Sequence, residues 1–167
     1  MSDERGVGPA LFRDVMGRFA TGVAIVTTVT DVGAEHAMTV NAFTSVSLDP
    51  PLVMFCADKA ARFHGMVLET GRWAVSVLSE EMRDASERFA TRGRALDGRL
   101  EGRPHVRGPA TGAPILAGAL AALECRTRAV HDGGDHTIVV GEVVGLDVPN
   151  PDGRPLIFYG GGYRTLG

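Results

Sequence analysis

Residues 37–56 read AMTVNAFTSVSLDPPLVMFC, where small hydroxyl or amide side chains alternate with apolar ones until two prolines interrupt the pattern. An apolar stretch over residues 52–57 follows and predicts a buried strand. Threonine, asparagine and serine pack a core poorly, but they can hydrogen-bond a polar ligand along a strand edge. The same alternation also fits a half-buried antiparallel strand with a polar outer face, and the pattern alone does not separate the two.

The segments around this stretch predict more strands than helices. Helices are expected from Pro9, over residues 60–68 before Gly71, and from a cap at Ser79 to about Thr91. Strands are expected over residues 23–29, 73–78, 118–130, 137–148 and 155–159, with a hairpin turn at residues 131–135. Residues 92–114 mix arginines with acids and are rich in Gly and Pro, which predicts a mobile surface loop with some helical turns.

These elements indicate one mainly β domain. The strands are not separated by regular helical crossovers, which argues against a doubly wound parallel sheet and favours an antiparallel barrel with peripheral helices. A chain of 167 residues has the length of one domain, and no repeat or linker divides it. We therefore expect a single domain over residues 9–167 after a disordered N-terminus, residues 1–8.

Composition argues against several classes of function. The net charge of −3 argues against nucleic acid as a partner, and no apolar run reaches the roughly 18 residues of a membrane span. The N-terminus lacks the apolar segment of a secretory signal, so we expect a cytoplasmic protein whose Cys56 and Cys125 are buried free thiols. No cysteine and histidine spacing predicts a metal site. Because no Rossmann glycine motif, P-loop or nucleophile elbow is present, any nicotinamide nucleotide would be bound without the usual fold.

Five segments together resemble a known family. Residues 38–53 (MTVNAFTSVSLDPPLV) and 134–143 (GDHTIVVGEV) resemble signature elements of the short-chain flavin reductases. Weaker matches are residues 12–28 (FRDVMGRFATGVAIVTT), 73–79 (WAVSVLS) and 156–163 (LIFYGGGY), all in the order expected of that family. The resemblance spans nearly the whole chain.

The resemblance implies a fold, an activity and partners. The fold would be an antiparallel split β-barrel of the Greek-key, FMN-binding type. The activity would be that of an NAD(P)H-dependent flavin reductase, an oxidoreductase that passes a hydride from NADH or NADPH to FMN or FAD. Reduced flavin would supply a separate flavin-dependent monooxygenase, and the protein would be a homodimer with flavin sites at or near the subunit interface.

The resemblance also implies two groups of flavin-binding residues. The first would meet the polar edge and ribityl chain of the flavin, since each buried polar atom needs a partner: Met38, Thr39, Val40, Asn41, Ala42, Ser45, Val46 and Ser47. The second lies where the next strand ends and a helix begins: Cys56, Ala57, Asp58, Lys59, Arg62 and Phe63. There the helix N-terminus, Lys59 and Arg62 would favour a phosphate, unless this is an ordinary solvated helix start.

Further positions complete the implied site. His136 is the candidate catalytic residue: it would lie by the nicotinamide and orient the reductant rather than act as an acid, unless it only caps a turn. Phe89 and Ala90 would lie near the flavin or else pack the core. Tyr163 would lie near the flavin or nicotinamide and Arg164 could meet a phosphate, unless both belong to a fraying tail. The arginines of residues 92–107 could contact a pyrophosphate, although such a charge run is more often a solvated surface.

Two other functions stay open at this point. The chain could be a flavin-binding split-barrel protein that retains its flavin, as a carrier or oxidase, without NAD(P)H turnover. It could also be a non-catalytic β-barrel interaction module. The sequence does not choose FMN over FAD, NADH over NADPH, or a tightly bound flavin over a diffusing one, and it does not identify the partner oxygenase.

Overall fold

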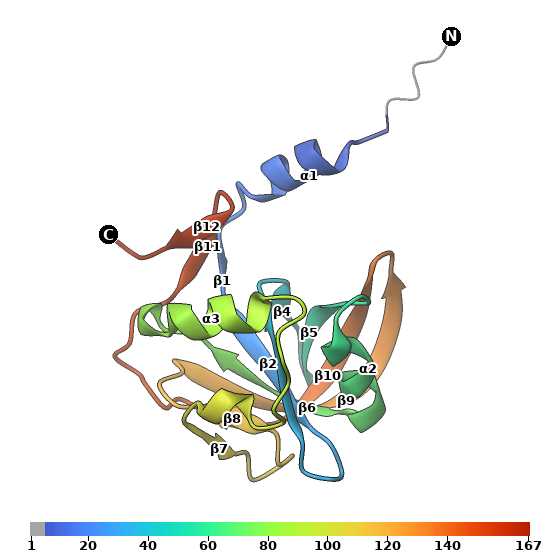
Figure 1. Cartoon of the computed structure of the whole chain (residues 1–167), viewed down its shortest axis with the longest axis vertical. Coiled ribbons are helices and arrows are strands. Elements are labelled where there is room, and N and C mark those ends of the chain that lie inside the picture. The colour runs from blue at the N-terminus through green and yellow to red at the C-terminus, as the bar shows by residue number, and fades with distance from the viewer. Residues whose placement is uncertain (1–5) are drawn as a thin grey trace.

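The computed structural model describes residues 6–167, and a strongly curved antiparallel sheet forms its body (Figure 1). Seven strands lie in the order β3–β2–β6–β9–β10–β5–β4. They are β2 Ala24–Val29, β3 Glu35–Val40, β4 Phe43–Leu48, β5 Pro51–Asp58, β6 Arg72–Val77, β9 Ala121–Gly133 and β10 His136–Asp147. Two smaller sheets join β1 Thr21–Gly22 to β11 Ile157–Tyr159 and β12 Gly162–Arg164, and β7 His105–Arg107 to β8 Pro114–Leu116. The prediction of disorder over residues 1–8 falls mostly outside the described residues.

The sheet curves because its two edge strands are neighbours in the sequence. β3 and β4 lie at opposite edges, yet only Asn41 and Ala42 connect them. A flat sheet of seven strands would hold its edges about 29 Å apart, whereas the chain from Val40 to Phe43 reaches at most about 11 Å. The sheet must therefore bend until its edges approach each other. The Cys56 N–H donates to the Ala42 carbonyl at 3.1 Å, which ties the connection to β5.

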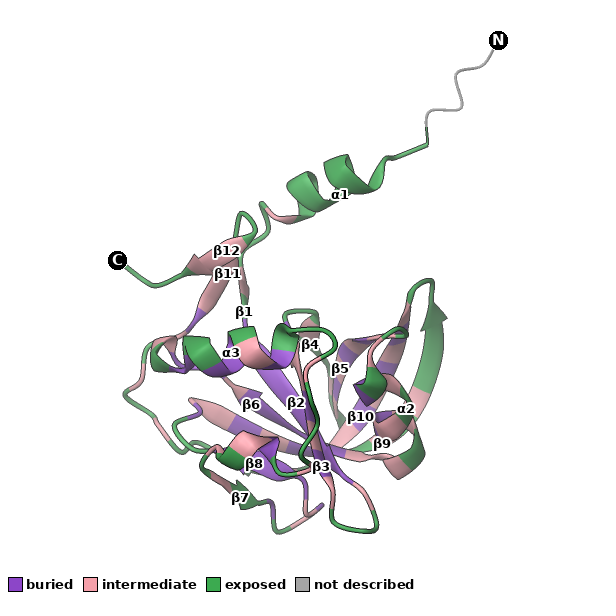
Figure 2. Cartoon of the chain, in the orientation of Figure 1, coloured by how far each residue is buried: buried purple, intermediate pink, exposed green. Residues whose placement is uncertain are grey.

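Residues 6–167 contain three α-helices, at Pro9–Met16 (α1), Arg62–Thr70 (α2) and Arg83–Ala90 (α3), with short 3-10 helices at Glu80–Met82 (η1) and Leu100–Gly102 (η2). Of the three α-helices, α2 and α3 pack on the sheet. α2 ends as predicted at Gly71, whose φ of 62° is left-handed and whose N–H donates to the Val67 carbonyl. Ser79 precedes η1, but its side chain makes no capping hydrogen bond. α1 extends away from the body and buries none of its residues (Figures 1 and 2). None of the helices in residues 6–167 has the length and hydropathy needed to span a bilayer.

The core consists of two main apolar clusters, one under each of α2 and α3. Under α2, Phe63 packs with Phe55 and Trp73, whose rings meet edge to face with centroids 4.8 Å apart. Under α3, Phe89 belongs to the cluster that contains Ile25. β2 is buried along its whole length because alternate residues enter different clusters. This explains why residues 23–29, VAIVTTV, do not alternate between apolar and polar side chains.

Two expectations from the sequence are wrong in detail. Residues 37–48 form two strands at opposite edges, because the chain leaves one edge at Asn41 and enters the other at Phe43. Residues 92–114 contain one short helical turn, η2, as expected of that segment, but they also contain β7 and the start of β8, which the loop prediction missed. Ion pairs from this segment to the body hold it in place, including Arg103–Asp84 at 3.0 Å and Arg107–Glu35 at 2.6 Å.

The contact between β10 and Trp73 predicts a large cost for adding one methyl group. A Cβ at Gly141 would lie 2.3 Å from Trp73 Cζ2, and the Trp73 side chain is fully buried. Gly141→Ala should lower the free energy of unfolding by about 2 kcal/mol in urea titration, because an overpacked core must shift to accept the methyl group. The matched control is Gly65→Ala in α2, where nothing lies within 4 Å of the added Cβ. It should raise stability by about 0.5–1 kcal/mol, and equal effects of both changes would contradict the packing argument.

Candidate functional site

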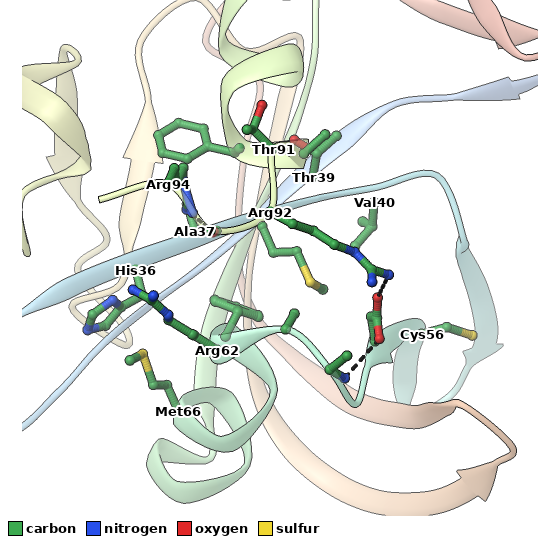
Figure 3. A pocket seen from close by; sticks show the side chains of 18 of the residues that line it. His36, Ala37, Thr39, Val40, Cys56, Arg62, Met66, Thr91, Arg92 and Arg94 are labelled. Atoms are coloured by element: carbon green, nitrogen blue, oxygen red, sulfur yellow. Dashed lines mark hydrogen bonds and ion pairs between the residues drawn. The ribbon is translucent and has the colours of Figure 1, made fainter. Parts of the chain in front are cut away.

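A cavity of about 510 Å³ lies between β3, the N-terminal part of α2 and the chain that leaves α3 (Figure 3). Its lining combines apolar side chains with a concentration of positive charge. The predicted residues that line it are Met38, Thr39, Val40, Asn41, Ala42, Cys56, Asp58, Arg62, Phe63, Phe89, Ala90 and His136. The structure thus brings these residues together in one cavity, although they come from five separate elements or their ends.

The first wall is the end of β3 and the connection that follows it, Met38 to Ala42. The Thr39 hydroxyl donates its hydrogen bond to the Ser86 carbonyl at 2.7 Å. Asn41 and Ala42 are exposed at the point where the chain crosses between the sheet edges. This wall therefore offers backbone groups and the Asn41 amide to a ligand, while Thr39 fixes α3 against β3.

The second wall is the end of β5 and the start of α2. Asp58 Oδ1 accepts the Ala60 N–H at 2.9 Å, which shapes the turn, and its other oxygen pairs with Arg92. Cys56 is half-buried rather than fully buried as expected. Burial raises the pKa of the Cys56 thiol, so a neutral thiol, not a nucleophilic thiolate, faces the cavity at neutral pH.

Positive charge gathers at the side of the cavity away from Cys56. Arg62 extends from α2 toward His36, and Arg94 donates to the Ala37 carbonyl at 2.7 Å (Figure 3). The Arg94 guanidinium also lies over the Phe89 ring, 5.0 Å from its centroid. Among the described residues, Arg62 has no carboxylate within ion-pair distance. Such a group of guanidinium donors suits a phosphate or pyrophosphate.

Several lining residues were not singled out from the sequence: His36, Ala37, Ala60, Ala61, Met66, Thr91, Gly93 and Leu96. Arg92 and Arg94 were noted only as part of a charged segment. His36 and Met66 belong to regular elements, and no local motif distinguishes them. The available signal was the position of Arg92 and Arg94 just after the predicted helix that contains Phe89.

His136 is the first residue of β10 and lies directly opposite Asp58 on the neighbouring strand β5. Its Nδ1 lies 2.7 Å from Asp135 Oδ1. This hydrogen bond and the nearby imidazole lower the pKa of the exposed Asp135 carboxyl. Asp135 thus orients the ring through Nδ1, and the positioning role of His136 stays a prediction.

Other predicted residues are not brought into the cavity: Ser45, Val46, Ser47, Ala57, Lys59, Tyr163 and Arg164. β4 carries the first three on an exposed or half-exposed edge strand. The Lys59 ammonium pairs with Asp132 on the β9–β10 hairpin. Tyr163 hydrogen-bonds Ser86 of α3 at 2.7 Å, so it belongs to an ordered hairpin and not to a fraying tail. A ligand role for these residues stays a prediction.

In the part of the chain that the structure describes, no group of three or more His, Cys, Asp or Glu side chains is placed to hold a metal ion. The family model of the flavin reductase like domain matches residues 16–167. The chain belongs to this family. The match covers all the strands and the two helices that line the cavity.

Curated relatives and solved structures agree with this assignment. The chain is 45% identical to an FMN reductase (NADH), SmoA of Agrobacterium fabrum, over 91% of this chain and 83% of that protein. It is 39% identical to HsaB of Mycobacterium tuberculosis, the reductase subunit of a flavin-dependent monooxygenase, over 96% of this chain and 83% of HsaB. The NADH:FAD oxidoreductase SgcE6 of Streptomyces globisporus, solved with NAD and FAD fragments, superposes with a TM-score of 0.88 at 38% identity. That superposition covers 98% of this chain and 97% of SgcE6.

The cavity fits a flavin by its own chemistry. Apolar side chains of Phe63, Met66 and Phe89 can cover an aromatic ring system, while Arg62 and Arg94 can meet an anionic tail. Its volume of about 510 Å³ lies in the range of small-molecule sites. Met38 to Ala42 would hold the ring edge, and Arg62 would hold the phosphate end.

The environment of His36 predicts a pH-dependent stability. Burial, and next the charge of Arg94, lower the pKa of His36 below its usual value. Between that lowered pKa and the unfolded value of about 6.5 the unfolded chain binds more protons, so stability should fall as the pH is lowered through this window. The urea midpoint should therefore drop less for His36→Gln than for the wild type between about pH 7.5 and about pH 5. His131→Gln, at an exposed position on the β9–β10 hairpin, is the control, and equal slopes for wild type and His36→Gln would contradict the prediction.

Proposed function

We propose that this protein is an NAD(P)H-dependent flavin reductase that reduces free FMN or FAD and supplies the reduced flavin to a separate monooxygenase. One observation carries the proposal: a single cavity joins the signature wall from Met38 to Ala42, the cationic side of Arg62 and Arg94, and His136. A flavin needs the first two features, and positioning of a nicotinamide would use the third.

The named relatives support both halves of this reaction. SmoA is named an FMN reductase that uses NADH, and SgcE6 is described as an NADH:FAD oxidoreductase. HsaB is named the reductase subunit of a flavin-dependent monooxygenase, which supports transfer of reduced flavin to a second protein. The relatives differ in flavin, so FMN and FAD are both proposed as substrates.

The chain's own residues bind and orient rather than react. When bound, the flavin accepts the hydride that NAD(P)H supplies, and this chemistry belongs to the two cofactors. Met38 to Ala42 and the apolar side chains hold the ring, while Arg62 meets the phosphate. His136, oriented by Asp135, positions the nicotinamide, since hydride transfer depends above all on the distance and alignment of the reacting atoms.

We also propose a homodimer in which α1 packs on a second copy of the chain. Leu11, Phe12, Val15 and Met16 of α1 are each at least half exposed. An isolated helix of eight residues is marginal in water, and exposed apolar patches of this kind mark interaction surfaces.

Two finer assignments accompany this proposal. The curvature of the sheet, with β3 and β4 joined by Asn41 and Ala42, supports a split β-barrel of the FMN-binding type. The free thiols of Cys56 and Cys125 and the need for NAD(P)H support action in the cytoplasm.

The direct test is NAD(P)H oxidation by the purified protein, which is monitored as the loss of NAD(P)H absorbance. Oxidation should depend on added FMN or FAD and should saturate with flavin, which also identifies the preferred flavin and nucleotide. Flavin that co-purifies with no NAD(P)H consumption would favour a carrier or oxidase instead. A colourless protein that quenches no flavin fluorescence would favour a plain interaction module.

The role of His136 predicts a split between two ligands. His136→Ala should raise the KM for the nicotinamide nucleotide by about fivefold to tenfold, the effect of losing one hydrogen bond, while the Kd for flavin changes by less than about twofold. Steady-state kinetics and flavin fluorescence quenching measure the two quantities separately. His131→Gln on the same hairpin serves as the control, and equal losses of nucleotide use and flavin binding would count against the assigned role.

A further inference from the structure

The cavity is lined by more positive than negative side chains, and these side chains differ in how firmly other groups hold them. Arg62, Arg92 and Arg94 contribute positive charge, and Asp58 is the only Asp or Glu among the described residues that line the cavity. Arg94 is held by the Ala37 carbonyl and by Phe89. Asp58 therefore has one cationic partner in the cavity wall, Arg92, which comes from the chain segment that follows α3.

The two members of this ion pair differ in how firmly they are held. Asp58 uses Oδ1 to accept the Ala60 N–H at 2.9 Å, and its side chain is only 21% exposed. The Arg92 side chain is 79% exposed, and among the described residues its guanidinium pairs with no carboxylate other than Asp58 (Figure 3). The carboxylate is thus fixed by the turn, while the guanidinium can change partner by rotation of its own side chain.

We propose that Asp58 is an internal competitor for Arg92, and that it sets the affinity of the cavity for the phosphate of the flavin. Without a ligand, Asp58 occupies Arg92. A flavin phosphate, which carries up to about two negative charges, recruits Arg92 away from Asp58, and the carboxylate recaptures Arg92 when the flavin leaves. This inference rests on the proposed function, and it names the residue that keeps the flavin a diffusing substrate.

The exposure of Arg92 makes such an exchange feasible. Water can solvate the guanidinium when it leaves Asp58, and the carboxylate keeps its hydrogen bond from the Ala60 N–H, so breaking the pair leaves no buried charge without a polar partner. The remaining effect is electrostatic: a carboxylate in the cavity wall repels a phosphate that approaches Arg92. It should act on phosphorylated flavins and leave riboflavin, which has no phosphate, unaffected.

The test compares FMN with riboflavin in Asp58→Asn. The asparagine Oδ1 can still accept the Ala60 N–H, so the turn is preserved while the competing charge is removed. The Kd for FMN should fall by about threefold to fivefold, and the Kd for riboflavin should change by less than about 1.5-fold. The readout is fluorescence quenching of oxidised flavin without NAD(P)H. Asp58 lies opposite His136 on the neighbouring strand, so a turnover assay would mix effects on flavin binding with effects on nucleotide positioning. FAD, titrated in parallel, should follow FMN.

Two further variants isolate the pair. Arg92→Gln should raise the Kd for FMN by about threefold, and in that background Asp58→Asn should tighten FMN less than it does in the wild type. The matched control is Asp31→Asn, which breaks the exposed Arg72–Asp31 pair with the same change of charge at a position outside the cavity. It should leave the ratio of the two Kd values unchanged.

The outcomes separate this inference from the proposed function. A wild type that binds neither flavin overturns the proposed function, and the inference with it. If the wild type binds both flavins, the inference alone is tested by the ratio of FMN affinity to riboflavin affinity. A ratio in Asp58→Asn that equals the wild-type ratio or lies below it overturns the inference. The inference also fails if Asp58→Asn tightens FMN equally in the wild-type and Arg92→Gln backgrounds.

Discussion

The two-residue connection between β3 and β4 is the constraint on which the rest of this structure depends. It joins the two outermost strands of a seven-stranded sheet, so the sheet must curve until its edges approach. The curvature gives the sheet an interior that accepts Phe55 and Trp73. It also places Asn41 and Ala42 at the mouth of the cavity, where the backbone changes direction and is free of regular strand pairing on both sides. The signature segment thus forms a wall of the cavity at the point where the chain leaves one edge of the sheet for the other.

A second constraint orders the segment after α3. Glu35 at the start of β3 is almost fully buried, and it pairs with both His105 and Arg107. Arg88 of α3 pairs with Glu101 at 2.8 Å, which closes the other side of the segment. A buried carboxylate needs partners, so these pairs hold the segment against the body. Arg92 and Arg94 gain defined positions as a result, and a stretch that reads as surface charge becomes part of the site.

Sequence reasoning succeeded where one local pattern determined the structure. The buried strand β2, the C-terminal glycine of α2 and the β9–β10 hairpin follow from apolar runs and turn residues, and all were predicted within a few positions. The change of sheet edge at Asn41 was not, because the same alternation describes one strand or two, and only the pairing partners decide. The ordering of residues 92–114 was not predicted for a related reason. Ion pairs between distant segments, such as Arg107 with Glu35, produce no periodic pattern in the sequence.

The polar side chains of the signature show why residue type alone could not assign roles within the site. Thr39 was expected to meet the flavin, yet its hydroxyl donates to the Ser86 carbonyl. The Ser86 hydroxyl in turn bonds the Tyr163 hydroxyl at 2.7 Å, so a chain of hydrogen bonds links β3 through α3 to the β11–β12 hairpin. Since Ser86 is fully buried, its polar groups need partners inside the protein, and Thr39 and Tyr163 supply them. Thr39 and Tyr163 fix α3, whose last residues, Phe89 and Ala90, line the site. They also connect the ligand-binding wall to the β11–β12 hairpin, which pairs with β1, the strand that follows α1.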